Sequence, residues 1–290
     1  MKNTIKTFSI FVKPNVFGKT KLDEKSSKIA DSIRRFNSNS HKPLDEIPNG
    51  GGDLIIAVGG DGTFLHSVNL TDFCKTKVYA GVHTGTLGFL QTISPDEVFA
   101  LIKYIHYDKE IPTRKVLVSS VTVNLTTGTP LHYYSLNEVL IAGENYSKIL
   151  FAEYINGELL QNVSGNGIII ATNTGDTAYS MNSGGAIDFS DHFQLNCKLI
   201  TPIVNASNER IIQNPIICSK VSIVPKSSDK LSILIDGMPR DIDSTQIESV
   251  DVSMLDGSNY INKFELKPYS KTDSIKRKIL GNDSWQVTLK

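Results

Sequence analysis

Short apolar runs alternate with amphipathic stretches in the first part of the chain. The apolar runs lie near residues 7–12, 53–58 and 77–82. Each has the length of a buried strand and is too short for most helices. Between the first two runs, residues 22–36 place Ile29, Ile33 and Phe36 at helical spacing. This alternation of strand and helix predicts a mostly parallel sheet with helices packed on it.

A helix start signal follows the third apolar run. Ser94 is a favoured N-cap residue, Pro95 suits the first helical turn, and Glu97 can complete a capping box with Ser94. The sequence therefore predicts a helix from about residue 95 to residue 106.

The pattern changes after Pro112 to stretches rich in β-branched residues. These stretches include 116–125, 133–141 and 231–235. β-Branched side chains at alternating positions are typical of half-buried strands. Asn156-Gly157 and Asp256-Gly257 are typical of two-residue hairpins, because both central positions of a type I′ turn need a positive φ. The second part is therefore predicted to be an all-β domain of antiparallel strands.

Three segments follow from these patterns. We predict an N-terminal α/β domain over residues 1–110, a C-terminal β-rich domain over 111–265 and a polar tail over 266–290 that could return to the first domain. The tail carries the basic run Lys276-Arg277-Lys278, which is typical of a solvated surface, so no function is assigned to it.

Composition narrows the class of protein. The chain of 290 residues has 30 basic and 30 acidic side chains, so no overall field draws it to nucleic acid or to an anionic membrane. No apolar run approaches the ~20 residues that a membrane helix needs. Cys74, Cys197 and Cys218 are far apart in sequence and form no Cys-x-x-Cys pair, which predicts neither a disulfide framework nor a thiolate metal site. A reducing cytoplasmic environment is expected.

The strongest chemical signal is the glycine-rich segment Gly59-Gly60-Asp61-Gly62-Thr63 directly after the apolar run 53–58. Glycines at the end of a strand let the backbone approach a ligand, and the amide groups that open the next helix attract phosphate. A phosphate site therefore has a physical basis here.

The carboxylate of Asp61 would repel a phosphate directly. Its presence indicates that it binds Mg²⁺ beside the phosphates or accepts a proton from an attacking hydroxyl, and both roles belong to phosphoryl transfer. The structural alternative is an aspartate that only caps the helix.

Two better-known nucleotide motifs are not complete in this chain. Gly18-Lys19-Thr20 resembles the end of a P-loop, but the first glycine of that motif would fall at Lys13. No Gly-x-Gly-x-x-Gly segment occurs, so a Rossmann cofactor site is not indicated.

Four sequence blocks together resemble the NAD kinase family in order and spacing. They are residues 59–65 (GGDGTFL), 81–90 (GVHTGTLGFL), 136–139 (LNEV) and 165–180 (GNGIIIATNTGDTAYS), the last followed by Gly184-Gly185. The first block is shared with lipid kinases and phosphofructokinases, whereas the later blocks narrow the choice to NAD kinases. The resemblance implies an α/β domain, a β domain, a dinucleotide bound in the cleft between them and self-association into a dimer or tetramer.

The resemblance also assigns roles to individual residues. Asp61 would be the catalytic base that deprotonates the adenosine 2′-hydroxyl of NAD, with ATP and Mg²⁺ supplying the phosphoryl group. The residues implied to line the ATP phosphates are Gly59, Gly60, Gly62 and Thr63. The residues implied to bind NAD are Asp61, Gly62, Phe64, His66, Asn137, Glu138, Asn166, Thr174, Thr177, Ala178, Tyr179 and Asn182.

Each assignment has a plainer structural alternative. Asn137 and Glu138 could be an exposed pair at the end of a strand, while Phe64, His66 and Tyr179 could be packing residues.

The chain departs from the family pattern at four positions. Asn166 stands where the family usually has Asp, Asn173 where it has Pro, Asp176 where it has Ser and His83 where it has Asn. The changes at Asn166 and Asp176 keep a non-catalytic dinucleotide sensor open as an alternative. The Gly-Gly-Asp-Gly turn, which lipid kinases share, keeps a lipid or sphingoid-base kinase open as another. The function expected from the sequence remains phosphorylation of NAD to NADP.

Overall fold

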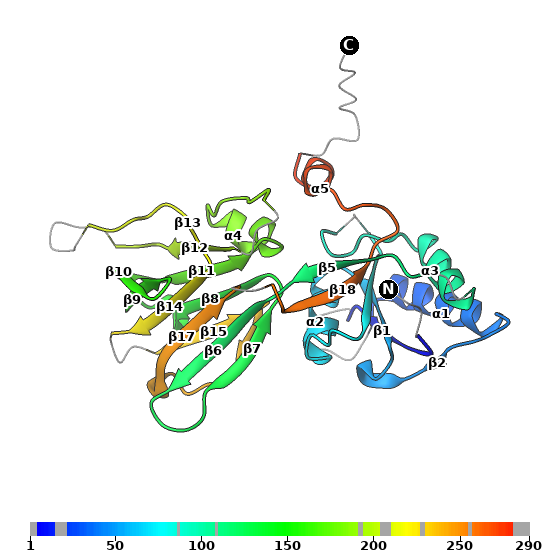
Figure 1. The fold of residues 1–290 in the computed structure, drawn as a ribbon, viewed down its shortest axis with the longest axis horizontal. Helices are drawn as coiled ribbons and strands as arrows, with labels where there is room; N and C mark the ends of the chain where they lie inside the picture. Colours follow the sequence, from blue (N-terminus) through cyan, green and yellow to red (C-terminus); the bar gives the residue numbers. More distant parts are fainter. Residues whose placement is uncertain are drawn as a thin grey trace, which may run out of the picture. The chain divides into compact units, whose positions relative to one another are not determined.

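The computed structural model describes residues 5–14, 22–85, 88–107, 110–190, 194–203, 210–226, 230–254 and 257–280 (Figure 1). Gly18-Lys19-Thr20 and Asp256 lie outside these described residues. The chain forms two compact units, one made of Met1–Lys115 with Ile261–Lys290 and the other of Val116–Tyr260. The first is α/β and the second consists mainly of antiparallel strands, so the predicted fold class is confirmed.

The first unit is built on a six-stranded sheet of order β2-β1-β3-β4-β18-β5. The strands are β1 (Thr7–Val12), β2 (Asp45–Glu46), β3 (Leu54–Gly59), β4 (Val78–His83), β5 (Thr113–Leu117) and β18 (Tyr260–Phe264). Strand β1 is parallel to β2 and β3, and β4 is parallel to β3 and β18. The three apolar runs predicted as strands are β1, β3 and β4.

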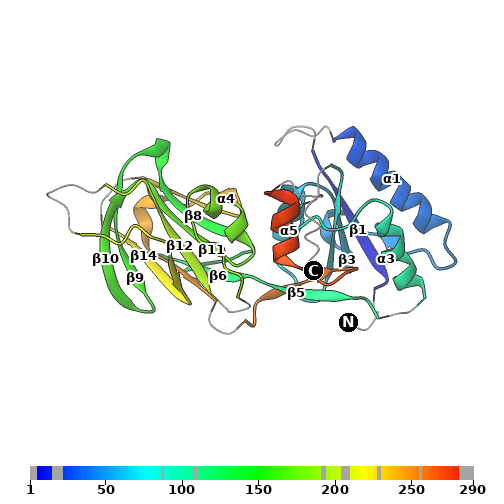
Figure 2. The same cartoon turned by 90° about the horizontal axis from the view of Figure 1, so that it is seen from above.

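Helices cover both faces of this sheet. They are α1 (Glu24–Ser38), α2 (Asp61–Leu70) and α3 (Glu97–His106), and α5 (Lys271–Lys278) follows β18. Figure 2 shows α1 and α3 side by side on one face, where the Phe36 and Phe99 ring centroids are 4.7 Å apart. Helix α2 packs on the other face, where Phe64 meets Tyr79 of β4 at a centroid distance of 6.3 Å.

The predicted capping box before α3 is confirmed. Ser94 N donates to Glu97 Oε2 at 2.9 Å, and Glu97 N donates to Ser94 Oγ at 3.2 Å. The helix begins at Glu97 and not at residue 95. Glu97 N also donates to Ser94 O at 3.1 Å, so the entry turn closes three residues back and is tighter than an α-helix.

The second unit is a sandwich of two six-stranded sheets. One has the order β10-β9-β14-β17-β6-β7 and the other β13-β12-β11-β8-β15-β16. The strands of the first sheet are β6 (Ser119–Leu125), β7 (Leu131–Ser135), β9 (Ile149–Ile155), β10 (Glu158–Gly165), β14 (Lys220–Pro225) and β17 (Ile247–Ser253). Those of the second are β8 (Glu138–Gly143), β11 (Gly167–Thr172), β12 (Leu195–Ile200), β13 (Ile216–Cys218), β15 (Leu231–Ile235) and β16 (Met238–Arg240).

Alternate residues of the two sheets fill one apolar core. Val121, Val250 and Phe151 enter it from one sheet, and Ile141 and Ile168 enter it from the other. Short helical segments complete the chain: η1 (Pro48–Gly50), η2 (Glu144–Tyr146), η3 (Gly175–Thr177), α4 (Tyr179–Asn182) and η4 (Ser244–Gln246). None of the helices in the described ranges is both long and apolar enough to cross a membrane.

Two hairpins of the second unit turn on dipeptides with positive φ. Asn156 and Gly157, with φ of 52° and 94°, join β9 to β10, which confirms that prediction. Asp236 and Gly237, with φ of 52° and 76°, join β15 to β16 in the same way. The sequence interpretation missed the second hairpin, and Asp236 proves important for the site.

The cysteines and the basic run of the tail have surroundings that the sequence alone did not show. Cys197 and Cys218 are far apart in sequence, but pairing of β12 with β13 brings their Sγ atoms to 3.6 Å while both remain free thiols. The basic run 276–278 is not a uniformly solvated surface, because it ends α5 and the Lys278 side chain is only 12% exposed.

Candidate functional site

The glycine-rich segment forms the turn between β3 and α2. Gly59 has a φ of 157°, and a Cβ at this position would lie 2.5 Å from Thr63 Oγ1, so only glycine fits. Gly60 and Gly62 are exposed, and a Cβ on Gly60 would meet no atom within 4 Å. The turn therefore offers an open approach to the first amide groups of α2, as a phosphate site requires.

Asp61 is the first residue of α2, and its carboxylate anchors the second sequence block. Oδ2 accepts a hydrogen bond from Phe89 N at 2.9 Å, while Oδ1 accepts bonds from Leu90 N and Gln91 N at 3.0 Å each. A Cβ on Gly88 would overlap Oδ1 of Asp61, which explains the glycine. Oδ2 carries one of these amide bonds, so it keeps capacity to accept a proton or contact a cation.

Other predicted residues of this turn differ in exposure. Thr63 is buried and its amide donates to Gly60 O at 2.9 Å. His66 is exposed on α2. Phe64 is 0% exposed, because its ring packs against Tyr79 across the sheet. This burial leaves no surface of Phe64 for adenine and matches the packing alternative.

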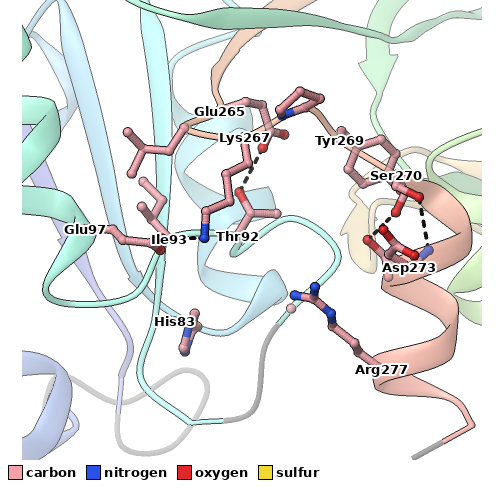
Figure 3. Close-up of a pocket in the computed structure, with 14 residues that line it drawn as sticks. His83, Thr92, Ile93, Glu97, Glu265, Lys267, Tyr269, Ser270, Asp273 and Arg277 are labelled. Carbon is pink, nitrogen blue, oxygen red and sulfur yellow. Dashed lines mark hydrogen bonds and ion pairs between the residues drawn. The ribbon is translucent and has the colours of Figure 1, made fainter. Parts of the chain in front are cut away.

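A pocket of about 390 Å³ lies beside this turn within the first unit (Figure 3). His83 at the end of β4, Gly88 and Thr92 line one side, while Glu265, Tyr269 and Arg277 line the side that leads into α5. Its volume falls within the range typical of small-molecule sites. Gly88 lines the pocket and also lies against the Asp61 carboxylate, so the pocket adjoins Asp61.

In the second unit, the fold brings the Asn137-Glu138 pair against the loop after β11. Thr172 N donates to Asn137 O at 2.8 Å, and Thr172 Oγ1 donates to Leu136 O at 2.6 Å. A Cβ on Gly175 would overlap the backbone of Asn137. These contacts place the start of η3 against the start of β8, so two blocks that are distant in sequence form one cluster.

Asn137 and Glu138 are buried polar residues and not an exposed strand-end pair. They are each 8% exposed. Among the described residues, no hydrogen bond reaches Asn137 Oδ1 or Glu138 Oε2. Burial, with a smaller contribution from the Asp236 carboxylate, raises the pKa of Glu138 to about 8. Buried polar atoms without partners are costly, so these two oxygens are candidates for contact with a ligand.

Asp236 organises this cluster. Its carboxylate accepts hydrogen bonds from Ser135 Oγ at 3.0 Å and from the amides of Leu136, Asn137 and Glu138 at 3.0, 2.7 and 3.3 Å. Asp236 therefore fixes the backbone from which both polar side chains project. The signal in the sequence was the Asp-Gly dipeptide after an apolar strand, which indicates a turn but not its partners.

The loop residues of the predicted NAD site have mixed environments. Thr177 is buried, Thr174 and Ala178 are half-buried, and Asn182 is exposed. Tyr179 is 45% exposed, so it is not a core tyrosine and its ring is accessible to a ligand.

Two of the four positions that depart from the family pattern, Asn173 and Asp176, serve the fold of the loop. Asn173 Nδ2 donates to Asp188 O at 3.1 Å and to Ser190 O at 2.8 Å. Asp176 is 0% exposed and accepts a hydrogen bond from Asp188 N at 2.7 Å, so its carboxyl group is buried and not presented to solvent. Both residues hold the segment around Asp188.

Asn166 is not part of this cluster. It precedes β11, and in the ladder Gly167 pairs with Ala142 while Ala171 pairs with Glu138. Asn166 is therefore separated from Glu138 by most of the strand, roughly 15 Å at the usual rise per residue.

A prediction follows from the buried carboxyl group of Glu138. Because the folded state binds this proton more tightly than the unfolded state, the associated stability is present at low pH and is lost as pH rises from about 4.5 toward about 8. Glu138→Gln resembles the protonated form at every pH. Its unfolding free energy relative to wild type should therefore increase by about 1 kcal/mol or more between about pH 5 and about pH 8.

Urea unfolding at both pH values measures this difference. Glu248→Gln, at an exposed glutamate of β17, is the matched control and should show little pH dependence relative to wild type. Equal pH dependence of wild type and Glu138→Gln would show that Glu138 is ionised in the folded protein at about pH 5.

The described residues contain no group of three or more His, Cys, Asp or Glu side chains arranged to hold a metal ion. Asp61 is the one carboxylate in the glycine-rich segment 59–65. A divalent cation that arrives on nucleotide phosphates needs only one or two protein carboxylates, so this donor set fits Mg²⁺ bound to ATP.

Comparison with known proteins relates the part of the chain that carries the glycine-rich turn and the part that carries Asn137 and Glu138 to the same family. The family models of the ATP-NAD kinase N-terminal and C-terminal domains match residues 7–111 and 136–263. The chain is 41% identical to the NAD kinase of Chlorobium phaeovibrioides over 171 residues, which are 57% of this chain and 58% of that protein. It is 32% identical to the NAD kinase of Lactobacillus delbrueckii over 207 residues, covering 69% of this chain and 75% of that protein.

The match to the Chlorobium protein thus covers less than two thirds of that relative's length. A solved structure, yeast NADH kinase complexed with NADH, aligns with a TM-score of 0.80 over 98% of this chain and 90% of that chain. Sequence identity in this alignment is 18%, so the likeness concerns the fold.

Proposed function

The chain belongs to the NAD kinase family, and on that premise we propose that it transfers the γ-phosphate of ATP to the 2′-hydroxyl of the NAD adenosine ribose. The observation that carries the proposal is the Asp61 carboxylate, which three amide groups hold at an exposed glycine turn and whose Oδ2 also faces Lys278 Nζ at 3.4 Å. A 2′-hydroxyl is a weak nucleophile, and a fixed carboxylate can take its proton as the bond to phosphorus forms.

The remaining roles divide between phosphate binding and adenosine binding. We assign the ATP phosphates to the turn of Gly59, Gly60, Gly62 and Thr63, with Mg²⁺ arriving on ATP and neutralising its charge. We assign NAD to Asn137, Glu138 and the loop that carries Thr174, Thr177, Ala178, Tyr179 and Asn182. The free oxygens of Asn137 and Glu138 suit the hydroxyl and amino groups of adenosine.

The proposal is tested by incubating purified protein with NAD, ATP and Mg²⁺ and measuring NADP with an NADP-specific dehydrogenase. Parallel reactions with NADH and with polyphosphate define the acceptor and the donor. NADP formation supports the kinase. Binding of NAD without NADP formation would instead favour a dinucleotide sensor, and loss of both would reopen the lipid-kinase alternative.

We also propose that the chain forms a dimer or tetramer through its second unit. Edge strands β10 and β13 carry exposed apolar side chains, with Leu159 54%, Leu160 41% and Ile217 42% exposed. Exposed apolar residues on unpaired edges favour self-association. Light scattering after gel filtration should give a mass of at least twice 31.9 kDa. A monomer at all concentrations would contradict this.

A cytoplasmic location is proposed as well. It is supported by the free thiols of Cys74, Cys197 and Cys218, because a reducing compartment preserves thiols. Imaging of a tagged full-length protein tests it, and recovery of the protein from another compartment would contradict it.

A further inference from the structure

The C-terminal end of α5 brings two cations to the surroundings of Asp61. Lys278 Nζ lies 3.4 Å from Asp61 Oδ2 and 3.8 Å from the ring centroid of Phe89. The Lys278 side chain is only 12% exposed although it lies in a polar helix. The residue before it, Arg277, extends from α5 into the adjoining pocket, toward His83 (Figure 3).

The contact between Lys278 and Asp61 is long for an ion pair. Charge-assisted hydrogen bonds between nitrogen and oxygen are usually about 2.7–2.9 Å. Lys263 of the same unit shows the contrast, with its Nζ 2.6 Å from Glu265 Oε1 and 2.7 Å from Thr92 Oγ1. Lys263 therefore has close partners, whereas the nearly buried ammonium of Lys278 has one distant carboxylate and an aromatic face among the described residues.

Arg277 is also available for an anion. Among the described residues it forms no ion pair within 4.0 Å, and its neighbours in the pocket include Gly88, which abuts the Asp61 carboxylate. The pocket of about 390 Å³ therefore extends from the Asp61 loop along α5 to Arg277. A ligand lying in it would meet Arg277 directly, whereas Lys278 is not among the described residues that line the pocket and lies beside Asp61, which Gly88 abuts.

The glycine-rich turn has no cation of its own that could offset the charge of Asp61 and of a bound phosphate. The segment 59–65 contains one carboxylate and no lysine or arginine, and the whole chain has no net charge to attract an anion. A phosphate chain brought next to Asp61 is repelled by its carboxylate unless a nearby cation offsets that charge. Cationic clamps on the phosphates are the usual means in enzymes that transfer phosphoryl groups.

We propose that Lys278 and Arg277 bind the phosphate chain of the phosphoryl donor, Lys278 at the phosphate next to Asp61 and Arg277 in the pocket. This inference rests on the proposed function for the identity of the donor. The phosphate chain, and not the nucleoside, is the part that these cations recognise. Inorganic tripolyphosphate should therefore bind to the same place as ATP.

The test compares Lys278→Met and Arg277→Met with Lys276→Met, which removes one charge from an exposed lysine of the same helix. Binding of tripolyphosphate and of ADP is measured by calorimetry on the full-length protein, and KM for ATP and for NAD is measured separately. Lys278→Met should weaken tripolyphosphate binding roughly ten- to hundredfold and raise KM for ATP, while KM for NAD stays within about twofold. Arg277→Met should act in the same direction, and Lys276→Met should resemble wild type.

Several outcomes would overturn the inference. Unchanged tripolyphosphate affinity in both variants, or equal changes in KM for ATP and NAD, would remove the donor role. Faster turnover in Lys278→Met would show that the lysine instead blocks Asp61. If a variant does not fold, the other variant still decides, because Arg277 does not contact Asp61. Lys278→Arg should recover part of the binding.

The test also separates this inference from the proposed function. Tripolyphosphate binding that depends on Lys278 in a protein that forms no NADP would support the anion site and contradict the kinase. NADP formation in a protein whose donor binding does not depend on Lys278 or Arg277 would support the kinase and contradict the anion site.

Discussion

Asp61→Asn is expected to lower kcat by roughly two to four orders of magnitude while NAD affinity stays near the wild-type value. The substitution removes the proton acceptor but keeps the size of the side chain. One consequence of the structure adds to the loss, because an amide nitrogen in place of Oδ2 would face Phe89 N, which donates to that oxygen at 2.9 Å. Steady-state kinetics of NADP formation and calorimetry with NAD measure the two quantities.

A second variant separates proton transfer from support of the loop. Gln91 Nε2 donates to Gly60 O at 2.8 Å and ties the same loop to the same turn without a carboxylate. Gln91→Leu should therefore stay within about tenfold of wild type if the main role of Asp61 is chemical. Near-wild-type turnover of Asp61→Asn would remove Asp61 from catalysis, and equal losses in both variants would make its role structural.

Asp236→Ala is expected to reduce the unfolding free energy by about 3–5 kcal/mol and to abolish measurable NAD affinity. The carboxylate accepts hydrogen bonds from four donors, three of them amides of the segment Leu136–Glu138. Removing it leaves those buried donors without an acceptor, at about 1–3 kcal/mol each before relaxation. Asn137 and Glu138 then lose the backbone geometry that presents them to a ligand. Urea unfolding followed by circular dichroism, together with calorimetry with NAD, measures both effects.

Asp243→Ala is the matched control for this prediction. Asp243 is also an aspartate of the second unit that accepts from a backbone amide, Thr245 N at 3.0 Å, but it is exposed. Its removal should leave both the free energy of unfolding and the NAD affinity close to the wild-type values. If Asp236→Ala behaves like Asp243→Ala, Asp236 does not anchor the pair.

Strands β3 and β4 were predictable from the sequence because their burial is local and nearly continuous, whereas the predicted stretches 116–125 and 133–141 are each divided between two strands. Strand β3 has every residue from Leu54 to Gly59 buried, so it appears in the sequence as an uninterrupted apolar run. Helix α1 was predictable for a related reason, since Ile33 enters the core while Ile29 and Phe36 pack at its edge. Such patterns depend on one element and its own core, which a single sequence records.

Helix α5 was not predictable in the same way. None of its residues is buried enough to leave an apolar pattern, and its eight residues are mostly polar. Its role comes from one lysine that meets Asp61, a partner 217 positions earlier in the chain. The sequence showed the basic run but not that its last lysine lies next to Asp61.

The site was predictable as motifs and not as contacts. The motifs identified Asp61, Asn137 and Glu138, but Asp236 lies about 100 positions from the amides that it holds, and only pairing of β15 with β8 brings them together. The sequence also left open whether Phe64 binds a ligand or packs in the core. The fold answers this question, because Phe64 is buried against Tyr79 of strand β4. The contacts of these site residues therefore depend on long-range strand pairing, which the motifs do not show.

Transfer of the phosphoryl group to the 2′-hydroxyl of NAD is tested by following that group itself. Purified protein is incubated with NAD, Mg²⁺ and ATP labelled at the γ-phosphate, and the dinucleotide product is analysed for the label and for the position of the new phosphate by nuclear magnetic resonance. If the chain transfers the γ-phosphate to NAD, the product is labelled NADP with the phosphate on the adenosine 2′-oxygen. Label that appears only in inorganic phosphate, or that remains in ATP while NAD is bound, would contradict it.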